Sequence, residues 1–329
     1  MVKISVIIPF FNSEEYIKNT LRSVSSQSIA DIEIICVDDG STDGSAEIVH
    51  EMSAKDSRIK YIKQENAGAG VARNNGIKFA EGRYVAFMDS DDEYPENGVL
   101  ELLFRKAEES DALICGGNIC KENKSLFSET KHGEGFVDFR ESQNIYWFTR
   151  NIYRRDFLIE QICYFPPYRV YEDPVFLLKA ISAAGKYYYV TKETYRVLSS
   201  HTSSTLSQRQ IKDYLCGILD IISISLKENY TEVFNAALNT LRSHFYMESL
   251  KCIHEGRADC EFFEKLISLN CFLGQVEGMR IQNEYVFFKT GNSLKYLVGK
   301  IRILTFRAIR KIFVTLPKSL FGSLEKPGG

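Results

Sequence analysis

Paired metal-binding cysteines are missing from this sequence of 329 residues: none of its eight cysteines stands in a CxxC pair. Their scatter through apolar runs argues against a zinc site or a disulfide framework and favours buried free thiols in a reducing cytosol. The sequence also has no run of about 18 apolar residues, so it predicts no membrane-spanning helix. A formal net charge of −2 argues against general nucleic-acid binding, because no basic field covers the chain.

Two phosphate-binding signatures are missing as well. The sequence contains no P-loop, and its first predicted strand is followed by Pro9-Phe-Phe-Asn12 instead of the glycine-rich turn of a dinucleotide-binding dehydrogenase. Gly68-Ala-Gly70 follows the third predicted strand, but Arg73 stands where a third glycine would be needed. These absences exclude the commonest nucleotide-binding enzymes of the α/β class.

Short apolar runs alternate with helical patterns over the first 115 residues. The sequence predicts strands at 4–8, 32–37, 59–62 and 84–88, and helices at 14–26, 43–55 and 68–80. Such alternation is typical of an α/β fold with a doubly wound, mostly parallel sheet and helices on both faces. In these sheets ligands bind beyond the carboxyl ends of the strands. Beyond residue 207 the pattern is helical.

Acidic residues cluster at two of these strand ends. Val37-Asp-Asp-Gly-Ser-Thr-Asp43 places carboxylates on a glycine turn, where they can accept hydrogen bonds from a ligand; a turn with Asp43 as a helix N-cap explains the motif equally well. The fourth strand leads into Asp89-Ser90-Asp91-Asp92. Three carboxylates within four residues repel one another unless a cation is present. Hard oxygen ligands suit Mg²⁺ or Mn²⁺, so the sequence predicts a divalent-metal site here.

Four motifs together resemble the family 2 glycosyltransferases, which share the GT-A fold. They are Val6-Ile-Ile-Pro9-Phe-Phe11-Asn12, Val37-Asp-Asp-Gly-Ser-Thr-Asp43, Asn66-Ala-Gly-Ala-Gly-Val-Ala-Arg73-Asn74 and Asp89-Ser-Asp91-Asp92, in the order of the family. The resemblance is close over residues 3–111 and weaker to about 204. It implies a GT-A catalytic domain at 1–204, with a nucleotide-binding half of about 1–115 and an acceptor half of about 116–204. A helical C-terminal region follows at 205–329.

The resemblance also implies a role for individual residues. The positions that match the nucleotide-sugar site are Pro9, Phe11 and Asp39 at the base, Arg73 against the nucleotide, and Asp89 and Ser90 near the ribose or metal; Asp91 matches the principal ligand of Mg²⁺ or Mn²⁺. Tyr171-Glu-Asp-Pro-Val-Phe176 resembles the motif whose Asp, here Asp173, is the general base. Because Pro174 suits the first position of a helix, Asp173 as an N-cap is the simpler structural interpretation.

The function that the resemblance implies is sugar transfer with inversion at the anomeric carbon. The donor would be a nucleotide-sugar, and the resemblance favours a UDP-hexose or UDP-N-acetylhexosamine. The acceptor would be a saccharide in cell-surface polysaccharide or lipopolysaccharide biosynthesis. Two alternatives stay open: a non-catalytic glycan-binding or scaffold protein on a transferase fold, and a sugar nucleotidyltransferase, although the latter's glycine-rich activating loop is missing.

One segment near the C-terminus is strongly basic. Between Tyr285 and Leu324 there are eight Lys or Arg residues and no Asp or Glu. Within it, residues 293–316 predict a basic amphipathic helix, which can lie in a bilayer interface where each cation contributes about 1 kcal/mol. Packing on the catalytic domain would explain the same pattern. The membrane interpretation predicts a cytoplasmic protein held peripherally on the inner membrane, and it suits a lipid-linked acceptor.

Overall fold

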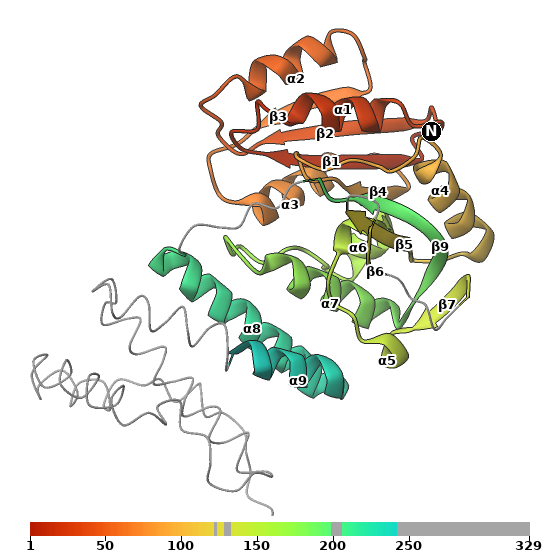
Figure 1. Ribbon diagram of the computed structural model, residues 1–329, viewed down its shortest axis with the longest axis vertical. Helices are drawn as coiled ribbons and strands as arrows, with labels where there is room; N and C mark the ends of the chain where they lie inside the picture. Colours follow the sequence, from red (N-terminus) through yellow and green to blue (C-terminus); the bar gives the residue numbers. More distant parts are fainter. Residues whose placement is uncertain (122–123, 128–132, 199–205, 242–329) are drawn as a thin grey trace, which may run out of the picture. The chain divides into compact units, whose positions relative to one another are not determined.

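In the computed structural model, the residues described are 1–121, 124–127, 133–198 and 206–241 (Figure 1). They belong to a unit that runs from Met1 to Glu248. No helix within them is long and apolar enough to cross a lipid bilayer. Residues 293–316, for which the sequence predicts a basic amphipathic helix, lie outside the described residues.

The described chain forms one mixed sheet. Its strands are β1 (Ile4–Phe10), β2 (Ile32–Asp38), β3 (Ile59–Lys63), β4 (Tyr84–Phe87), β5 (Ile114–Lys121), β6 (Lys124–Phe127), β7 (Gly135–Asp138), β8 (Asn151–Arg154) and β9 (Lys186–Arg196). Their order is β3-β2-β1-β4-β8-β5-β9-β7, with β6 paired to β5. Strands β1 to β4 pair in parallel, as the sequence predicts, and so do β5 and β9. The pairs that involve β8, β6 and β7 are antiparallel.

Helices cover both faces of this sheet. They are α1 (Ile17–Ser25), α2 (Ser45–Ser53), α3 (Ala69–Phe79), α4 (Val99–Ser110), α5 (Phe139–Ser142), η1 (Phe148–Arg150), α6 (Arg155–Glu160), α7 (Glu172–Ala184), α8 (Gln208–Glu228) and α9 (Thr231–Thr240). Every residue of β1 and β2 is buried, which is why their sequences are mostly apolar and do not alternate; inside them, the buried Ser5 hydroxyl donates to Glu33. Ile4, Val6 and Ile8 face the core that α1, α2 and α4 share. On the other face, a Cβ at Gly76 of α3 would lie 2.3 Å from Ile7, so this contact requires glycine.

An aromatic cluster joins the sheet to α7. Phe165 and Phe176 stack with ring centroids 3.9 Å apart, and Phe87 of β4 meets them edge-on at 5.3 and 5.5 Å. Phe148 of η1 completes the group at 5.3 Å from Phe165. Large buried rings of this kind dominate core energetics. They fix the start of α7 near the end of β4, where the candidate site lies.

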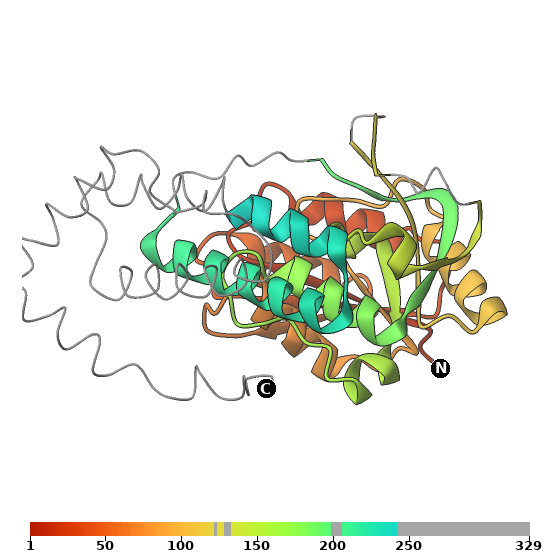
Figure 2. The same ribbon diagram turned by 90° about the horizontal axis from the view of Figure 1, so that it is seen from below.

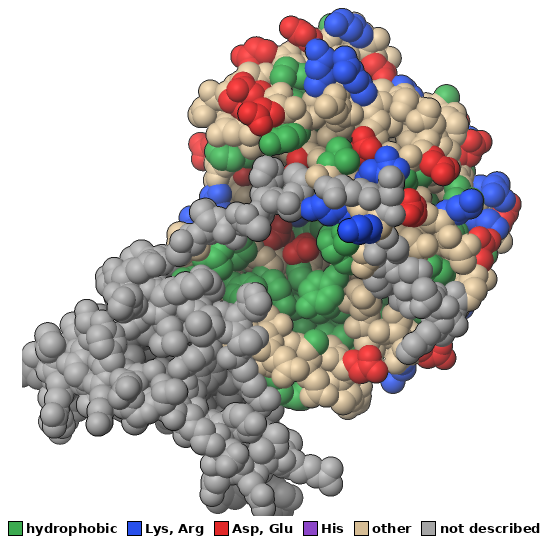
Figure 3. All heavy atoms as spheres, viewed as in Figure 1, with side chains coloured by type: hydrophobic (Ala, Val, Ile, Leu, Met, Phe, Trp, Pro, Cys, Tyr) green, Lys and Arg blue, Asp and Glu red, His purple; other side chains and the backbone are tan. Residues whose placement is uncertain are grey.

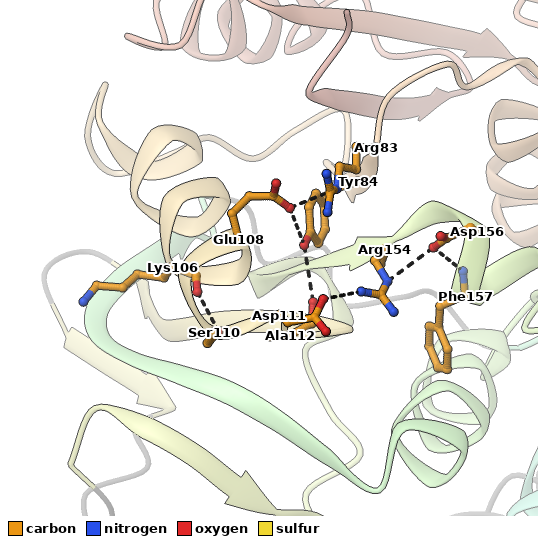
Figure 4. Close-up of polar contacts among 10 residues, drawn as sticks. All are labelled: Arg83, Tyr84, Lys106, Glu108, Ser110, Asp111, Ala112, Arg154, Asp156 and Phe157. Atoms are coloured by element: carbon orange, nitrogen blue, oxygen red, sulfur yellow. Dashed lines mark hydrogen bonds and ion pairs between the residues drawn. The ribbon is translucent and has the colours of Figure 1, made fainter.

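A polar network at the opposite end of β4 ties α4 to the sheet (Figure 4). The Tyr84 hydroxyl donates to Glu108 at 3.0 Å, and Arg83 pairs with the same carboxylate at 3.0 Å. Arg154 of β8 donates to Asp111 at 2.7 Å. Because Tyr84 begins β4 while the acidic motif follows its end, this network is separate from the candidate site.

Helix α8 opens the region that the sequence predicts to be helical. Ser207 and Gln210 form a capping box at its start, which accounts for the beginning of the helix at this point. Figures 1 and 2 show α8 running beside α7 and followed by α9. Residues of α8 therefore pack on the element that carries Asp173.

Candidate active site

A pocket opens where β1, β2 and β4 end. Its lining is Pro9, Phe10, Phe11, Ser13, Asp39, Ala69, Arg73, Asp89, Ser90 and Asp91. It includes every residue that the sequence predicts for the nucleotide-sugar and metal sites. Parallel strands deliver them to one edge of the sheet, which is the expected place for a ligand. Asp173 is outside this lining, at the start of α7.

Asp39 organises one wall of the pocket. Its buried carboxylate accepts hydrogen bonds from the Gln64 side chain at 2.7 Å and from the backbone N–H groups of Ala67 and Gly68 at 2.7 and 2.8 Å. Gly40 has a φ of +84°, and a Cβ there would lie 3.2 Å from the backbone nitrogen of Asn66. Glycine is therefore required where this turn approaches the next loop. A carboxylate offers about four acceptor positions, so Asp39 can hold this loop and accept a further N–H from a ligand.

Phe11 supplies an exposed aromatic surface. Its side chain is 48% exposed although it lies beside a strand that is otherwise buried. The next residue, Asn12, has a φ of 48° and accepts a hydrogen bond from the Thr42 backbone at 2.9 Å, while its own N–H donates to Ser41. The two loops thus fix each other. An aromatic ring held at a pocket edge can stack on a planar base.

The acidic motif after β4 is a braced turn. The Thr20 hydroxyl donates to the backbone carbonyls of Ser90 and Asp92 at 2.9 Å each, and the Ser90 hydroxyl lies 2.9 Å from that of Ser13. Asp92 points away from the pocket: its carboxylate accepts from the Tyr195 hydroxyl at 2.8 Å and the Leu198 N–H at 3.0 Å. Burial and the nearby Asp89 charge raise the pKa of Asp92 to about 7. Asp89, Ser90 and Asp91 are left to face the pocket.

The acidic edge of the pocket suits a divalent cation that takes some of its ligands from the bound substrate. Within the described residues, no group of three or more His, Cys, Asp or Glu side chains is placed to hold a metal. Asp89 and Asp91 nevertheless line the same cavity, and Mg²⁺ is usually bound by one or two carboxylates plus substrate phosphates. The donor set therefore fits an ion that arrives with a diphosphate.

Arg73 joins the two sides of the site. Its guanidinium is buried, donates to Asp89 at 2.8 Å and donates to Glu172 at 3.0 Å. The same group lies over the rings of Phe148 and Phe165, at 4.8 and 5.2 Å from their centroids, within cation–π range. The resemblance implies a nucleotide contact for Arg73. The structure adds a connection between the end of β4 and the start of α7.

Asp173 lies inside the first turn of α7, so its interpretation as an N-cap is wrong. The N-cap is Tyr171, with a left-handed backbone, and Glu172 is the first helical residue. Burial and the neighbouring charge of Glu172 raise the pKa of Asp173 to about 7, although Arg73 lowers it. A carboxylate with such a pKa can take up a proton near neutral pH. The residue as a whole is half-buried.

Asp43 also differs from its predicted role as N-cap. Gly44 occupies that position, because α2 begins one residue later than an Asp43 cap would require. The Asp43 carboxylate instead accepts from the backbone N–H groups of Ser45 and Glu14, at 3.1 Å each. It ties the loop after β1 to the loop after β2.

Sequence reasoning missed the partners that hold these acids. Glu172 lies 99 residues from Arg73, and Tyr195 lies 103 residues from Asp92. The adjacent acids in Tyr171-Glu-Asp-Pro174 were a usable signal for Glu172, since two neighbouring carboxylates call for a cation. For Thr20 and Tyr195 the sequence offers no comparable signal.

A further feature of the surface is a hollow over α6 and α7. Over the region where Figure 1 labels α6 and α7, Figure 3 shows a hollow lined largely by hydrophobic side chains, with acidic side chains within it. Sugar rings present apolar as well as polar faces. This surface thus combines the two kinds of contact that a saccharide needs.

Comparisons with known proteins agree with this geometry. The chain matches the family description "Glycosyl transferase family 2" over residues 5–171. It is 47% identical to glycosyltransferase GlyA of Streptococcus pneumoniae over 123 residues, 37% of this chain and 18% of the relative. It is 36% identical to the GalNAc(5)-diNAcBac-PP-undecaprenol beta-1,3-glucosyltransferase of Campylobacter jejuni over 131 residues, 39% of this chain and 42% of the relative. The chain thus spans less than half the length of these curated relatives.

A solved structure resembles most of this chain. The crystal structure of Staphylococcus aureus TarS 1-349 in complex with UDP-GlcNAc superposes with a TM-score of 0.63 at 27% identity, covering 74% of this chain and 73% of that chain. This likeness confirms the predicted α/β fold of the GT-A type. Since the family description matches about half of its residues, the chain belongs to glycosyl transferase family 2.

Proposed function

We propose that this protein is an inverting glycosyltransferase that moves a sugar from a UDP-sugar to a saccharide acceptor during synthesis of a cell-surface polysaccharide. The observation that carries the proposal is the pocket, in which an exposed aromatic ring, a buried carboxylate and the Asp89-Ser90-Asp91 turn line one cavity. The UDP-GlcNAc bound to TarS and the glucosyltransferase activity named for the C. jejuni relative support it.

The donor binds with its base against the first two loops. Phe11 packs on the base, Pro9 shapes the same wall, and the carboxylate of Asp39 accepts an N–H of the base. The three hydrogen bonds that Asp39 already accepts hold it rigid, which reduces the entropy lost on binding. Asp89 and Ser90, at the end of β4, contact the ribose and the phosphates that follow.

Asp91, with Asp89, would hold Mg²⁺ or Mn²⁺, and the diphosphate of the donor would supply further oxygen ligands. When bound, the ion neutralises the negative charge of the leaving nucleoside diphosphate. Thr20 and Ser13 keep the turn that carries these carboxylates in place through their hydroxyl groups. The protein thereby presents its two acids before the substrate arrives.

Asp173 is the general base. The acceptor hydroxyl oxygen bonds to the anomeric carbon as the bond from that carbon to the phosphate oxygen breaks, and the hydroxyl proton passes to the Asp173 carboxylate. A single displacement of this kind inverts the anomeric centre. A positioned base typically contributes about 10²–10⁴-fold to the rate. Arg73 holds Glu172 beside it and limits the rise of the pKa of Asp173.

The acceptor is a saccharide, and a lipid-linked one agrees with two features. The C. jejuni relative is named for an acceptor joined to undecaprenol, and the sequence predicts a basic amphipathic helix at residues 293–316. Such a helix would hold the protein peripherally on the cytoplasmic face of the inner membrane, near a lipid-linked substrate.

A panel of UDP-hexoses and UDP-N-acetylhexosamines tests the proposal. Purified protein with Mn²⁺ should be stabilised against heat by UDP and should release UDP from at least one of these donors. An excess of EDTA should abolish the release. Asp111→Asn, in the network at the far end of β4, is the matched control and should behave like the wild type. If no donor of this panel is bound or turned over, the proposed UDP-sugar donor is refuted and the scaffold alternative gains support.

A further inference from the structure

The residue before the acid pair has an unusual backbone. Tyr171 has a φ of 67° and a ψ of 20°, the left-handed conformation, at the point where the chain enters α7. Bulky side chains rarely adopt this conformation, and they keep it only where surrounding structure enforces it. The direction in which Glu172 and Asp173 leave this turn depends on it. The enforcing structure must therefore contact Tyr171.

Helix α8 makes that contact. The ring of Tyr214 meets the ring of Tyr171 edge-to-face with centroids 4.6 Å apart. Gly217, one turn further along, faces the same residue: a Cβ on Gly217 would lie 2.9 Å from the Tyr171 carbonyl oxygen and 3.0 Å from its Cδ1. Glycine inside a helix is unfavourable, and here the close packing of Tyr171 against the helix explains its presence. No other residue type leaves room for Tyr171.

The same helix also accepts hydrogen bonds from residues just before Tyr171. The Tyr168 hydroxyl donates to Asp220 at 2.9 Å, and the backbone N–H of Arg169 donates to Asp213 at 3.0 Å. Asp213, Gly217 and Asp220 are spaced by four and three residues, which puts them on one face of α8. With Tyr214 they form a continuous surface along residues 168–171. The approach to the acid pair is thus fixed at several points by one helix.

We infer that α8 positions Asp173 for the transfer reaction by holding Tyr171 in its left-handed turn, which makes Tyr171 and Gly217 positioning residues. The inference rests on the proposed role of Asp173 as general base. Effective base catalysis needs the carboxylate within hydrogen-bond reach of the acceptor hydroxyl, and a misplacement of about 1 Å can lower a rate by about 10²-fold. The residues that line the donor pocket lie between Pro9 and Asp91, and no residue of α8 is among them.

A comparison of two alanine variants within α8 tests this inference. Gly217→Ala adds a methyl group against Tyr171, while Ser223→Ala adds alanine at an exposed position of the same helix. UDP affinity by calorimetry, thermal stability, and the kcat and KM of UDP release are measured for the full-length proteins. We expect Gly217→Ala to lower kcat by about 10- to 10²-fold with UDP affinity unchanged, and Ser223→Ala to match the wild type. Wild-type kcat in Gly217→Ala overturns the inference.

Two further comparisons keep the result interpretable. If Gly217→Ala does not fold, Tyr171→Phe and Tyr171→Val replace it: the first keeps the ring against Tyr214 and should retain kcat, and the second, β-branched at positive φ, should lose it. Equal kcat in these two variants also overturns the inference. Asp173→Asn distinguishes the proposed role of Asp173 as general base from the positioning role of α8. Full turnover in Asp173→Asn refutes the proposed base, whereas loss in Asp173→Asn with full turnover in Gly217→Ala refutes the positioning role alone.

Discussion

Replacing Arg73 by methionine tests how the two sides of the site are held together. Arg73→Met keeps an unbranched side chain, but it removes the guanidinium and with it both ion pairs and the cation–π contacts with Phe148 and Phe165. The carboxylates of Asp89 and Glu172 would then both lose their ion pair with Arg73. Breaking a buried ion pair destabilises a protein by about 3–5 kcal/mol. Because the Asp89 side chain is 36% exposed, water recovers part of this loss, and we expect about 3 kcal/mol.

Thermal unfolding gives the measurement. In a unit of this size, 1 kcal/mol shifts Tm by about 2–4 °C, so Arg73→Met should lower Tm by about 6–12 °C. The matched control is Arg105→Met, which breaks the exposed pair between Arg105 and Glu109 and should change stability by less than about 1 kcal/mol.

UDP affinity separates the two roles of Arg73. If Arg73 connects β4 to α7, Arg73→Met should have a lower Tm than the wild type whether or not UDP is present. A pure nucleotide contact, as the resemblance implies, predicts weaker UDP binding with little change of Tm. If Arg73→Met unfolds within about 2 °C of the wild type, the reasoning from its ion pairs is refuted.

Three further predictions concern the acids. Asp91→Asn should abolish UDP release with little loss of Tm, because it relieves repulsion within the acidic turn; activity that survives EDTA would contradict this. Asp173→Asn should lower kcat by at least about 10²-fold while calorimetry shows wild-type UDP affinity; weaker UDP binding with kcat retained would move Asp173 to the donor site. Since the pKa of Asp173 is raised to about 7, its base form accumulates as pH rises, so kcat/KM should increase through pH 7 and then level off. A profile flat between about pH 5.5 and 8.5, with UDP affinity measured alongside, would exclude this titration as the controlling one.

The nucleotide-binding half was predictable because local patterns decide it. Strands β1 and β2 are mostly apolar, as is typical of strands buried on both faces, and their observed bounds extend the predicted ones by one or two residues. The acids at their ends stand out because Glu33 is the only other charged residue in these two strands. Parallel strands then bring Asp39 and Asp91 to one edge of the sheet without any further information.

The connections across the site were not predictable from such patterns. Tyr171 has no intrinsic preference for positive φ, so its turn comes from the packing of α8 and not from local sequence. The pairing of Arg73 with Glu172 depends on how α7 crosses the sheet, which periodicity does not describe. Likewise the sequence presents Asp92 as the third carboxylate of a metal motif, whereas in the structure it accepts hydrogen bonds from Tyr195 and Leu198.

The place of α8 in the core bears on where the catalytic unit ends. Five of its side chains are almost fully buried: Ile211, Leu215, Ile218, Ile221 and Ile222. Burying each contributes about 1.5–3 kcal/mol, so together they approach the whole net stability of an ordinary domain. A boundary near residue 204, suggested by the family motifs, separates these side chains from α7, against which α8 packs. The family description likewise ends at residue 171, one residue before the acid pair. The residues that the family description covers, the proposed base Asp173 and the helix inferred to position it therefore lie in successive parts of this chain.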